Sequence, residues 1–273
     1  MTTAVRPTAA TARIPAVAES VTRADALPSW LDLRFGLPDP AEGWVRCAEL
    51  LDEPERFDAW RKILGEWLLE EYGDAPERTT AGYVMGWYLS VPALLAALLF
   101  HTERRVPSLR PTDLAFLLPT EGRPHPVGVA LLADEFACLP DDPAGDCPEA
   151  TVVGSEAALA ALLRARYAAH AARFVAAYAP GVRLGRRMLW AQATDSLDGA
   201  TWLAGQLHGD EGAGVADAAM LLPERLAPFT SASTLRSARD EDGGARWTRR
   251  RESCCFHYAI PGTTACVTCP RVS

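Results

Sequence analysis

The sequence predicts an α+β protein, with a mainly α-helical body, a small β-hairpin or sheet, and a cysteine-rich C-terminal loop. Long segments carry apolar residues three and four positions apart, as amphipathic helices do. Two short apolar runs flank a polar turn near residue 121, as in a β-hairpin. Four of the seven cysteines fall in the last 20 of the 273 residues. This length allows one large domain or two small ones with a sizeable core.

Composition excludes several classes of protein. Hydrophobic residues make up 49% of the chain and charged residues 23%, which are ordinary globular values and exclude a wholly disordered chain. The formal net charge of −8 argues against a general nucleic-acid binder, which is usually basic. The N-terminus lacks the apolar stretch of a signal peptide, so we expect a cytoplasmic protein with reduced thiols.

The N-terminal residues 1–35 are expected to form a flexible arm, because they are rich in Ala, Thr, Pro and Arg. A body over residues 36–236 follows. Its first element is expected to be a helix from Asp39 to about Tyr72, with apolar residues at spacings near three and four. The polar segment 73–79 then breaks the helix.

The most hydrophobic segment, Ala81 to Phe100, contains 20 residues and no charge, which is long enough to span a membrane. Its internal Gly86, Ser90 and Pro92 equally suit a kinked helix inside a helical bundle. Because amphipathic helices surround this single segment, we expect a buried core helix. A peripheral association with a membrane stays open.

A β element is expected over residues 106–139. The runs 113–119 and 125–132 form a hairpin across the turn Thr-Glu-Gly-Arg, and residues 135–139 add a third strand. Two long helices follow. One spans 156–178 with Ser155 as its N-cap, and the other spans 184–207, with a short helix near 215–222 beyond it. A polar joint over 237–246 separates the body from a C-terminal segment, 246–273.

The C-terminal segment contains Cys254, Cys255, Cys266 and Cys269, the pattern Cys-Cys-x10-Cys-x2-Cys. A two-residue gap lets both sulfurs of the second pair face one metal. Successive side chains of an extended segment diverge, so the adjacent cysteines must lie on a turn or serve different edges of a larger cofactor. A turn at 260–262 folds the segment back and brings the pairs together.

On spacing alone, these four thiols could bind a zinc ion, bind a [2Fe–2S] cluster or form disulfides. Structural zinc usually takes two pairs of the form Cys-x2–4-Cys, which adjacent cysteines do not provide. A [2Fe–2S] cluster also takes four thiolates and tolerates unequal spacing. Disulfides are disfavoured because seven cysteines leave one unpaired. The spacing favours the cluster over zinc, and we expect ordinary buried thiols at Cys47, Cys138 and Cys147.

The tail RRRESCCFHYAIPGTTACVTCP resembles the C-terminal signature of the FhuF-like ferric-siderophore reductases, and its four cysteines match that pattern one by one. A weaker similarity covers Leu189 to Leu203, where the family's helix usually begins Trp-Gly-Asn and this chain has Trp190-Ala191-Gln192. The resemblance implies a C-terminal iron–sulfur loop with a [2Fe–2S] cluster on the four cysteines. It also implies an oxidoreductase acting on metal ions, a ferric reductase in iron acquisition.

The implied reaction is chemically reasonable for these residues. Siderophores hold Fe(III) through hard oxygen donors, and one-electron reduction to the softer Fe(II) loosens that grip. Arg249, Arg250 and Arg251 could stabilise the reduced cluster or bind an anionic chelate, and Trp190 and Gln192 are further substrate candidates. His257 is not expected to be a cluster ligand, because the four cysteines already supply the four ligands that the cluster takes.

Partners follow from what the sequence contains. No Gly-x-Gly-x-x-Gly or P-loop motif stands in a fitting context, so electrons should arrive from another protein, a ferredoxin or a flavoprotein. The second partner is the ferric siderophore, and no nucleic acid is expected. The alternative function is a non-enzymatic protein that binds a siderophore, uses its metal structurally, or senses iron or redox state.

Overall fold

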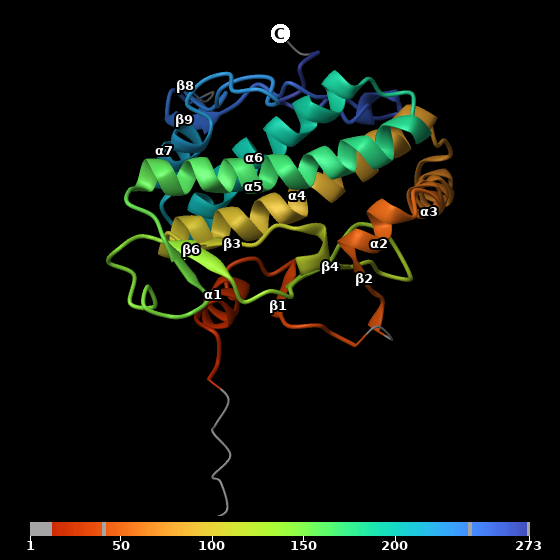
Figure 1. The fold of residues 1–273 in the computed structure, drawn as a ribbon. Helices are drawn as coiled ribbons and strands as arrows, with labels where there is room; N and C mark the ends of the chain where they lie inside the picture. Colours follow the sequence, from red (N-terminus) through yellow and green to blue (C-terminus); the bar gives the residue numbers. More distant parts are fainter. Residues whose placement is uncertain (1–12, 40–41, 240–241, 272–273) are drawn as a thin grey trace, which may run out of the picture.

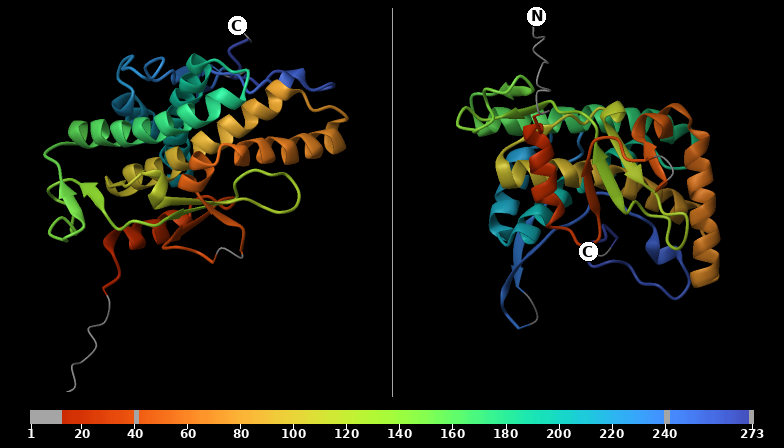
Figure 2. Two further views of the ribbon diagram at one scale, coloured as in Figure 1. Left: turned by 45° about the vertical axis from the view of Figure 1, so that its right-hand side comes forward. Right: turned by 90° about the horizontal axis from the view of Figure 1, so that it is seen from below.

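The structure is a computed structural model that describes residues 13–39, 42–239 and 242–271. It has three layers (Figure 1). Helices fill the middle layer, small sheets and the first helix cover one side, and the C-terminal segment crosses the other side. The left view of Figure 2 shows the same arrangement. The α+β class with a mainly helical body is therefore confirmed.

Helix α4 (Glu77–Glu103) is the centre of the helical layer. Among the described residues it is the one helix long and apolar enough to cross a membrane, yet 78% of its most apolar window is buried inside the protein. A helix that is apolar all round is typical of a protein core. The predicted buried helix over 81–100 is thus confirmed, and it contains Pro92.

Three long helices surround α4, and each ends within one residue of the position that the sequence predicts. They are α3 (Glu55–Tyr72), α5 (Glu156–Tyr178) and α6 (Arg186–His208). The Ser155 hydroxyl accepts the N–H of Ala158 at 3.2 Å and caps α5. Gly209 ends α6 in the left-handed conformation, with φ +83°. Helix α7 (Glu211–Leu221) then packs against α6.

The predicted hairpin is confirmed. Strands β4 (Leu114–Leu117) and β5 (Gly128–Leu131) are antiparallel, with Leu114 opposite Leu131. Strands β1 (Asp32–Phe35) and β2 (Trp44–Arg46) complete a four-stranded sheet in the order β1-β5-β4-β2.

The expected third strand forms, but in a different sheet. Strand β6 (Phe136–Cys138) lies between β3 (Val106–Pro107) and β7 (Ala150–Val152).

The flexible arm predicted over 1–35 is wrong from residue 16 onward. Helix α1 (Ala16–Asp25) is followed by β1, which pairs with β5 in parallel. Val17, Val21 and Ala24 are at most 1% exposed and lie on one face of α1. Their spacing of four and three is an apolar stripe that the Ala-rich composition obscures. Residues 1–12 lie outside the described residues.

Two other expected elements also differ. The single helix expected from Asp39 to Tyr72 consists of β2, the short helix α2 (Cys47–Asp52) and α3, and Pro54 separates the two helices. The polar joint expected over 237–246 is an antiparallel ribbon of β8 (Arg236–Arg239) and β9 (Ala245–Thr248). Gly243, with φ +83°, supplies the turn conformation that hairpins favour.

Acid destabilisation tests the packing of His170 on α5. The ring is 1% exposed, burial lowers its pKa to about 4, and its Nδ1 lies 2.7 Å from the carbonyl oxygen of Leu109. The unfolded chain takes up this proton near pH 6.5 and the native state does not. The free energy of unfolding should therefore fall as pH drops from 6.5 towards 4, by up to about 3 kcal/mol.

Urea unfolding at pH 7.5 and pH 5 measures this loss. His170→Gln, which does not titrate, should lose less stability than the wild type over that interval. The control His208→Gln changes an exposed histidine and should behave as the wild type. Equal losses in all three proteins would show that His170 does not cause the effect.

Candidate metal centre

The adjacent cysteines lie on a tight turn. Phe256, which follows them, has φ +59°, and its N–H donates to the Sγ of Cys254 at 3.3 Å. A left-handed conformation is unfavourable for a bulky residue, so the surrounding contacts must hold it. Thr79 of α4 supplies one such contact, because its hydroxyl donates to the carbonyl oxygen of Phe256 at 2.9 Å. At this turn Cys254 is buried and Cys255 is half-buried.

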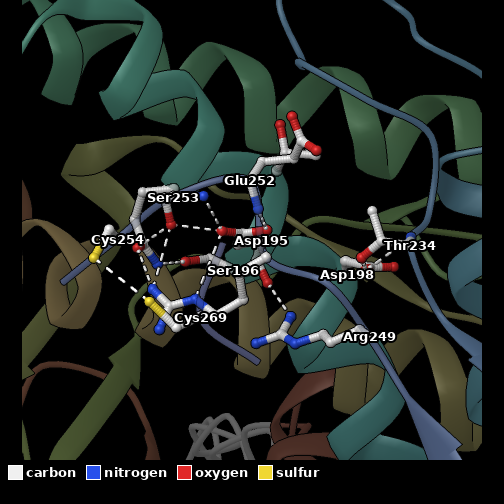
Figure 3. Close-up of polar contacts among 12 residues, drawn as sticks. Asp195, Ser196, Asp198, Thr234, Arg249, Glu252, Ser253, Cys254 and Cys269 are labelled. Carbon is white, nitrogen blue, oxygen red and sulfur yellow. Dashed lines mark hydrogen bonds and ion pairs between the residues drawn. The ribbon is translucent and has the colours of Figure 1, made fainter. Parts of the chain in front are cut away.

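The chain then folds back and brings the second cysteine pair to the first. A short 3-10 helix (His257–Ala259) leads into a turn that contains Gly262, with φ +77°. The N–H of Arg251 donates to the carbonyl oxygen of Thr268 at 3.1 Å and joins the two ends of the loop. The Sγ atoms of Cys254 and Cys269 lie 3.9 Å apart (Figure 3).

The four thiols differ in exposure. Cys254 and Cys269 are buried, whereas Cys255 and Cys266 are half-buried. Burial raises the pKa of Cys254 to about 11 and also raises the pKa of Cys266. These groups are therefore protonated thiols at neutral pH until a metal replaces the protons.

Arg251 is the positive group beside the thiols. Burial alone would lower its pKa, but the charges of Asp195, Cys255 and Cys266 outweigh burial and raise it. Its Nε is buried and has no hydrogen-bond partner. A guanidinium with a spare donor suits an anionic group bound by these cysteines.

Helix α6 holds the segment that enters the cysteine turn (Figure 3). The Asp195 carboxylate accepts the N–H of Glu252 at 2.9 Å and the N–H of Ser253 at 2.8 Å. The Ser253 hydroxyl lies 2.5 Å from the same carboxylate and 2.8 Å from Oε1 of Gln192. That Oε1 also accepts from Nη2 of Arg251 at 3.0 Å. Asp195 and Gln192 are buried, so these bonds are shielded from water.

A second carboxylate of α6, Asp198, holds the chain before β8. It accepts from the Ser233 hydroxyl at 2.6 Å and from the N–H of Thr234 at 3.2 Å. Arg249 donates to the carbonyl oxygen of Asp195 at 2.6 Å, and its guanidinium fills the space in which a side chain at Gly199 would lie. Sequence reasoning missed Asp195 and Asp198. The only hint in the sequence is that two carboxylates stand three residues apart in a helix whose other side chains mostly face the interior.

Helix α4 supports the turn from the other side. A Cβ at Gly82 would lie 2.8 Å from the carbonyl oxygen of Cys255, so only glycine permits this approach. A hydrogen bond of 2.5 Å joins the Tyr83 hydroxyl and Nδ1 of His257. Burial, and then the neighbouring Cys255, raises the pKa of Tyr83 to about 12.

The structure separates the other predicted site residues. Arg249 and Arg251 turn inward onto α6, whereas Arg250 is exposed. Gln192 contacts the loop. Trp190 packs edge-on against Phe229, with ring centroids 6.2 Å apart. Cys47 and Cys138 are buried in the body, as expected, whereas Cys147 is only half-buried and accepts a hydrogen bond from Arg13.

The arrangement of the thiols fits a cluster better than one ion. Across residues 13–39, 42–239 and 242–271, no three His, Cys, Asp or Glu side chains converge on a single metal position. The loop nevertheless gathers four thiols, a backbone N–H directed at sulfur and a guanidinium. A cofactor with two metal atoms can take thiolates at separate edges, whereas a zinc ion needs all four around one point.

Comparison with known proteins agrees with this geometry. Residues 251–271 match the family model described as the FhuF 2Fe-2S C-terminal domain. The matched residues include all four clustered cysteines, and the cofactor of this segment is a [2Fe–2S] cluster. No curated protein matches the chain.

Two glycines of α4 provide a matched test of the support beneath the loop. Alanine favours a helix over glycine by about 1 kcal/mol, but a Cβ at Gly82 collides with the Cys255 backbone. At Gly86, one turn away, a Cβ meets only the Gln192 side chain at 3.7 Å. Gly82→Ala should therefore lower iron and sulfide per chain or alter the visible circular dichroism of the cluster. Gly86→Ala should leave both unchanged, and identical behaviour of the two variants would contradict this packing.

Removal of the Asp195 carboxylate should free the chain segment that leads into the cysteine turn. Asp195→Ala leaves two backbone N–H groups without their acceptor, while the Ser253 hydroxyl can still donate to Gln192, so the expected loss is about 3 kcal/mol of unfolding free energy. We expect lower cluster content and faster loss of visible absorbance under a chelator. Asp141→Ala, at an exposed position, should change stability by less than about 0.5 kcal/mol. If Asp195→Ala kept its cluster as firmly as this control, the carboxylate would not hold the loop.

Proposed function

We propose that this chain, whose C-terminal segment is a FhuF-type [2Fe–2S] domain, is a reductase that transfers one electron to siderophore-bound Fe(III) and releases Fe(II). The observation that carries the proposal is the position of the four cysteines of a [2Fe–2S] segment at a partly exposed edge of a helical body. Cys254 and Cys269 lie beneath that edge, and Cys255 and Cys266 form it. A chelate can therefore approach without entering the core.

The same four cysteines would hold the cluster. When bound, the cluster supplies or accepts a single electron, which is the change needed between Fe(III) and Fe(II). Val267, between the second pair, is 81% exposed, so the loop tip is open to a partner. The side chains of Cys255 and Cys266 would form the contact edge for outer-sphere transfer.

The neighbouring residues would set how strongly the reduced form of the cluster is stabilised. The four cysteine thiolates would hold an anionic cluster, whose negative charge would increase by one on reduction. The Arg251 guanidinium, beside Cys255 and Cys266, offsets part of that charge and favours the reduced form. Gln192 and Asp195 fix its position and limit rearrangement between the two states.

The proposed partners are a ferric siderophore and a protein that donates electrons. The sequence offers no dinucleotide-binding motif after a strand, so a ferredoxin or flavoprotein would reduce the cluster. We place the reaction in the cytoplasm, where thiols stay reduced.

Anaerobic single-turnover mixing tests the proposal. The protein reduced with dithionite and freed of excess reductant should recover its oxidised visible spectrum on addition of a ferric siderophore, with one Fe(II) trapped per cluster. Cys266→Ser should lose cluster iron and activity, while Cys147→Ser, outside the cluster loop, should retain both. A colourless zinc protein would overturn the proposal. A cluster that stays reduced with every ferric chelate would indicate a structural or sensing role.

A further inference from the structure

A cavity of about 250 Å³ lies between α4 and α6, next to the cluster loop. Most of its wall is apolar or aromatic and comes from both helices and from the chain before β1. The main contributors are Trp30, Leu31, Trp87, Val91, Leu94 and Leu203. Its polar wall includes Gln192, Asp195 and Arg249, the residues of the loop and helix that fix the cysteine turn. An occupant would therefore lie beside the supports of the cluster.

The cavity favours a ligand with one anionic group. The Asp195 carboxylate is already used by Glu252 and Ser253. Arg249 donates to a backbone carbonyl oxygen, and among the described residues no carboxylate lies within ion-pair distance of it, although Asp195 and Asp198 attract its charge from further away. A half-buried guanidinium without an ion-pair partner, at the wall of an apolar cavity, attracts an anionic oxygen.

The aromatic wall favours a ring. Trp87 is held in place by stacking on Trp60, with centroids 6.4 Å apart, and by the guanidinium of Arg123 at 5.1 Å. Trp30 is 51% exposed, an unusual state for so large an aromatic side chain. His125 also lines the cavity. Rings pack well on indoles in offset or edge-to-face arrangements.

The volume limits what can enter. Pockets for drug-sized ligands usually measure roughly 300–1,000 Å³. The cavity thus accepts a single substituted ring and its linker, but not a whole iron chelate. The iron would stay outside, on the side where Trp87 meets Tyr83, the neighbour of Cys255.

We propose that this cavity is a substrate subsite for one aryl arm of a ferric chelate whose ligands are aromatic oxygen donors, such as catecholates. The ring lies against Trp30 and Trp87, and an anionic oxygen faces Arg249. The inference rests on the proposed reductase function and specifies its substrate class. Aliphatic hydroxamate arms lack the ring, so they gain less binding free energy from contact with the aromatic wall.

Redox-inert gallium complexes test binding apart from electron transfer. In calorimetric titrations of the cluster-loaded protein, gallium(III) 2,3-dihydroxybenzoate should bind at least tenfold more tightly than gallium(III) acetohydroxamate. Leu203→Phe fills the cavity and should weaken the first complex about tenfold. Leu207→Phe, one turn further along α6 and outside the cavity wall, should bind as the wild type does. Trp30→Ala, at an exposed position, should also weaken binding and serves as the deciding variant if Leu203→Phe fails to fold.

Equal affinity for both gallium complexes, or equal binding by all variants, would overturn the inference. The two proposals also fail separately. If the protein reduces ferric chelates and Leu203→Phe does so at the rate of Leu207→Phe, the reductase stands and the subsite is wrong. If gallium binding depends on the cavity but no ferric chelate oxidises the cluster, the cavity binds aryl chelates but the reductase, and with it the role as a substrate subsite, is wrong.

Discussion

The cysteine loop depends on one buried carboxylate, that of Asp195. A carboxylate in the interior is costly unless it accepts several hydrogen bonds, and this one accepts them from two consecutive backbone N–H groups and the Ser253 hydroxyl. Those donors immediately precede Cys254. The carboxylate therefore fixes both the position and the direction of the chain as it enters the cysteine turn.

The rest of the loop takes its shape from the helices beneath it. Apart from one 3-10 helix, residues 249–271 contain no helix or strand, so their conformation depends on a few hydrogen bonds within the loop and on contacts with α4 and α6. Gly82 admits the Cys255 backbone and Thr79 binds the carbonyl oxygen of Phe256. The body thus serves as a rigid template, and the cluster would complete the loop by joining the two cysteine pairs.

These relations explain what could be predicted from the sequence. The long helices and the hairpin follow local periodicity, and the cysteine spacing is a local chelation pattern, so both are visible without a structure. Asp195 is different, because its partners lie 57 and 58 residues later and a lone helical carboxylate usually faces solvent. Helix α1 was missed for a related reason: its buried residues are small and stand in a composition typical of disorder.

The two halves of the proposed site share one helix. Tyr83, which contacts the cysteine turn through His257, and Trp87, which lines the cavity, are four residues apart on α4 and so lie on the same face. Their ring centroids are 5.4 Å apart. Because α4 is a buried core helix, it would hold a bound aryl arm at a fixed separation from the exposed edge of the cluster. Chelates of different shape could then change their affinity for the cavity without changing the distance that the electron must travel.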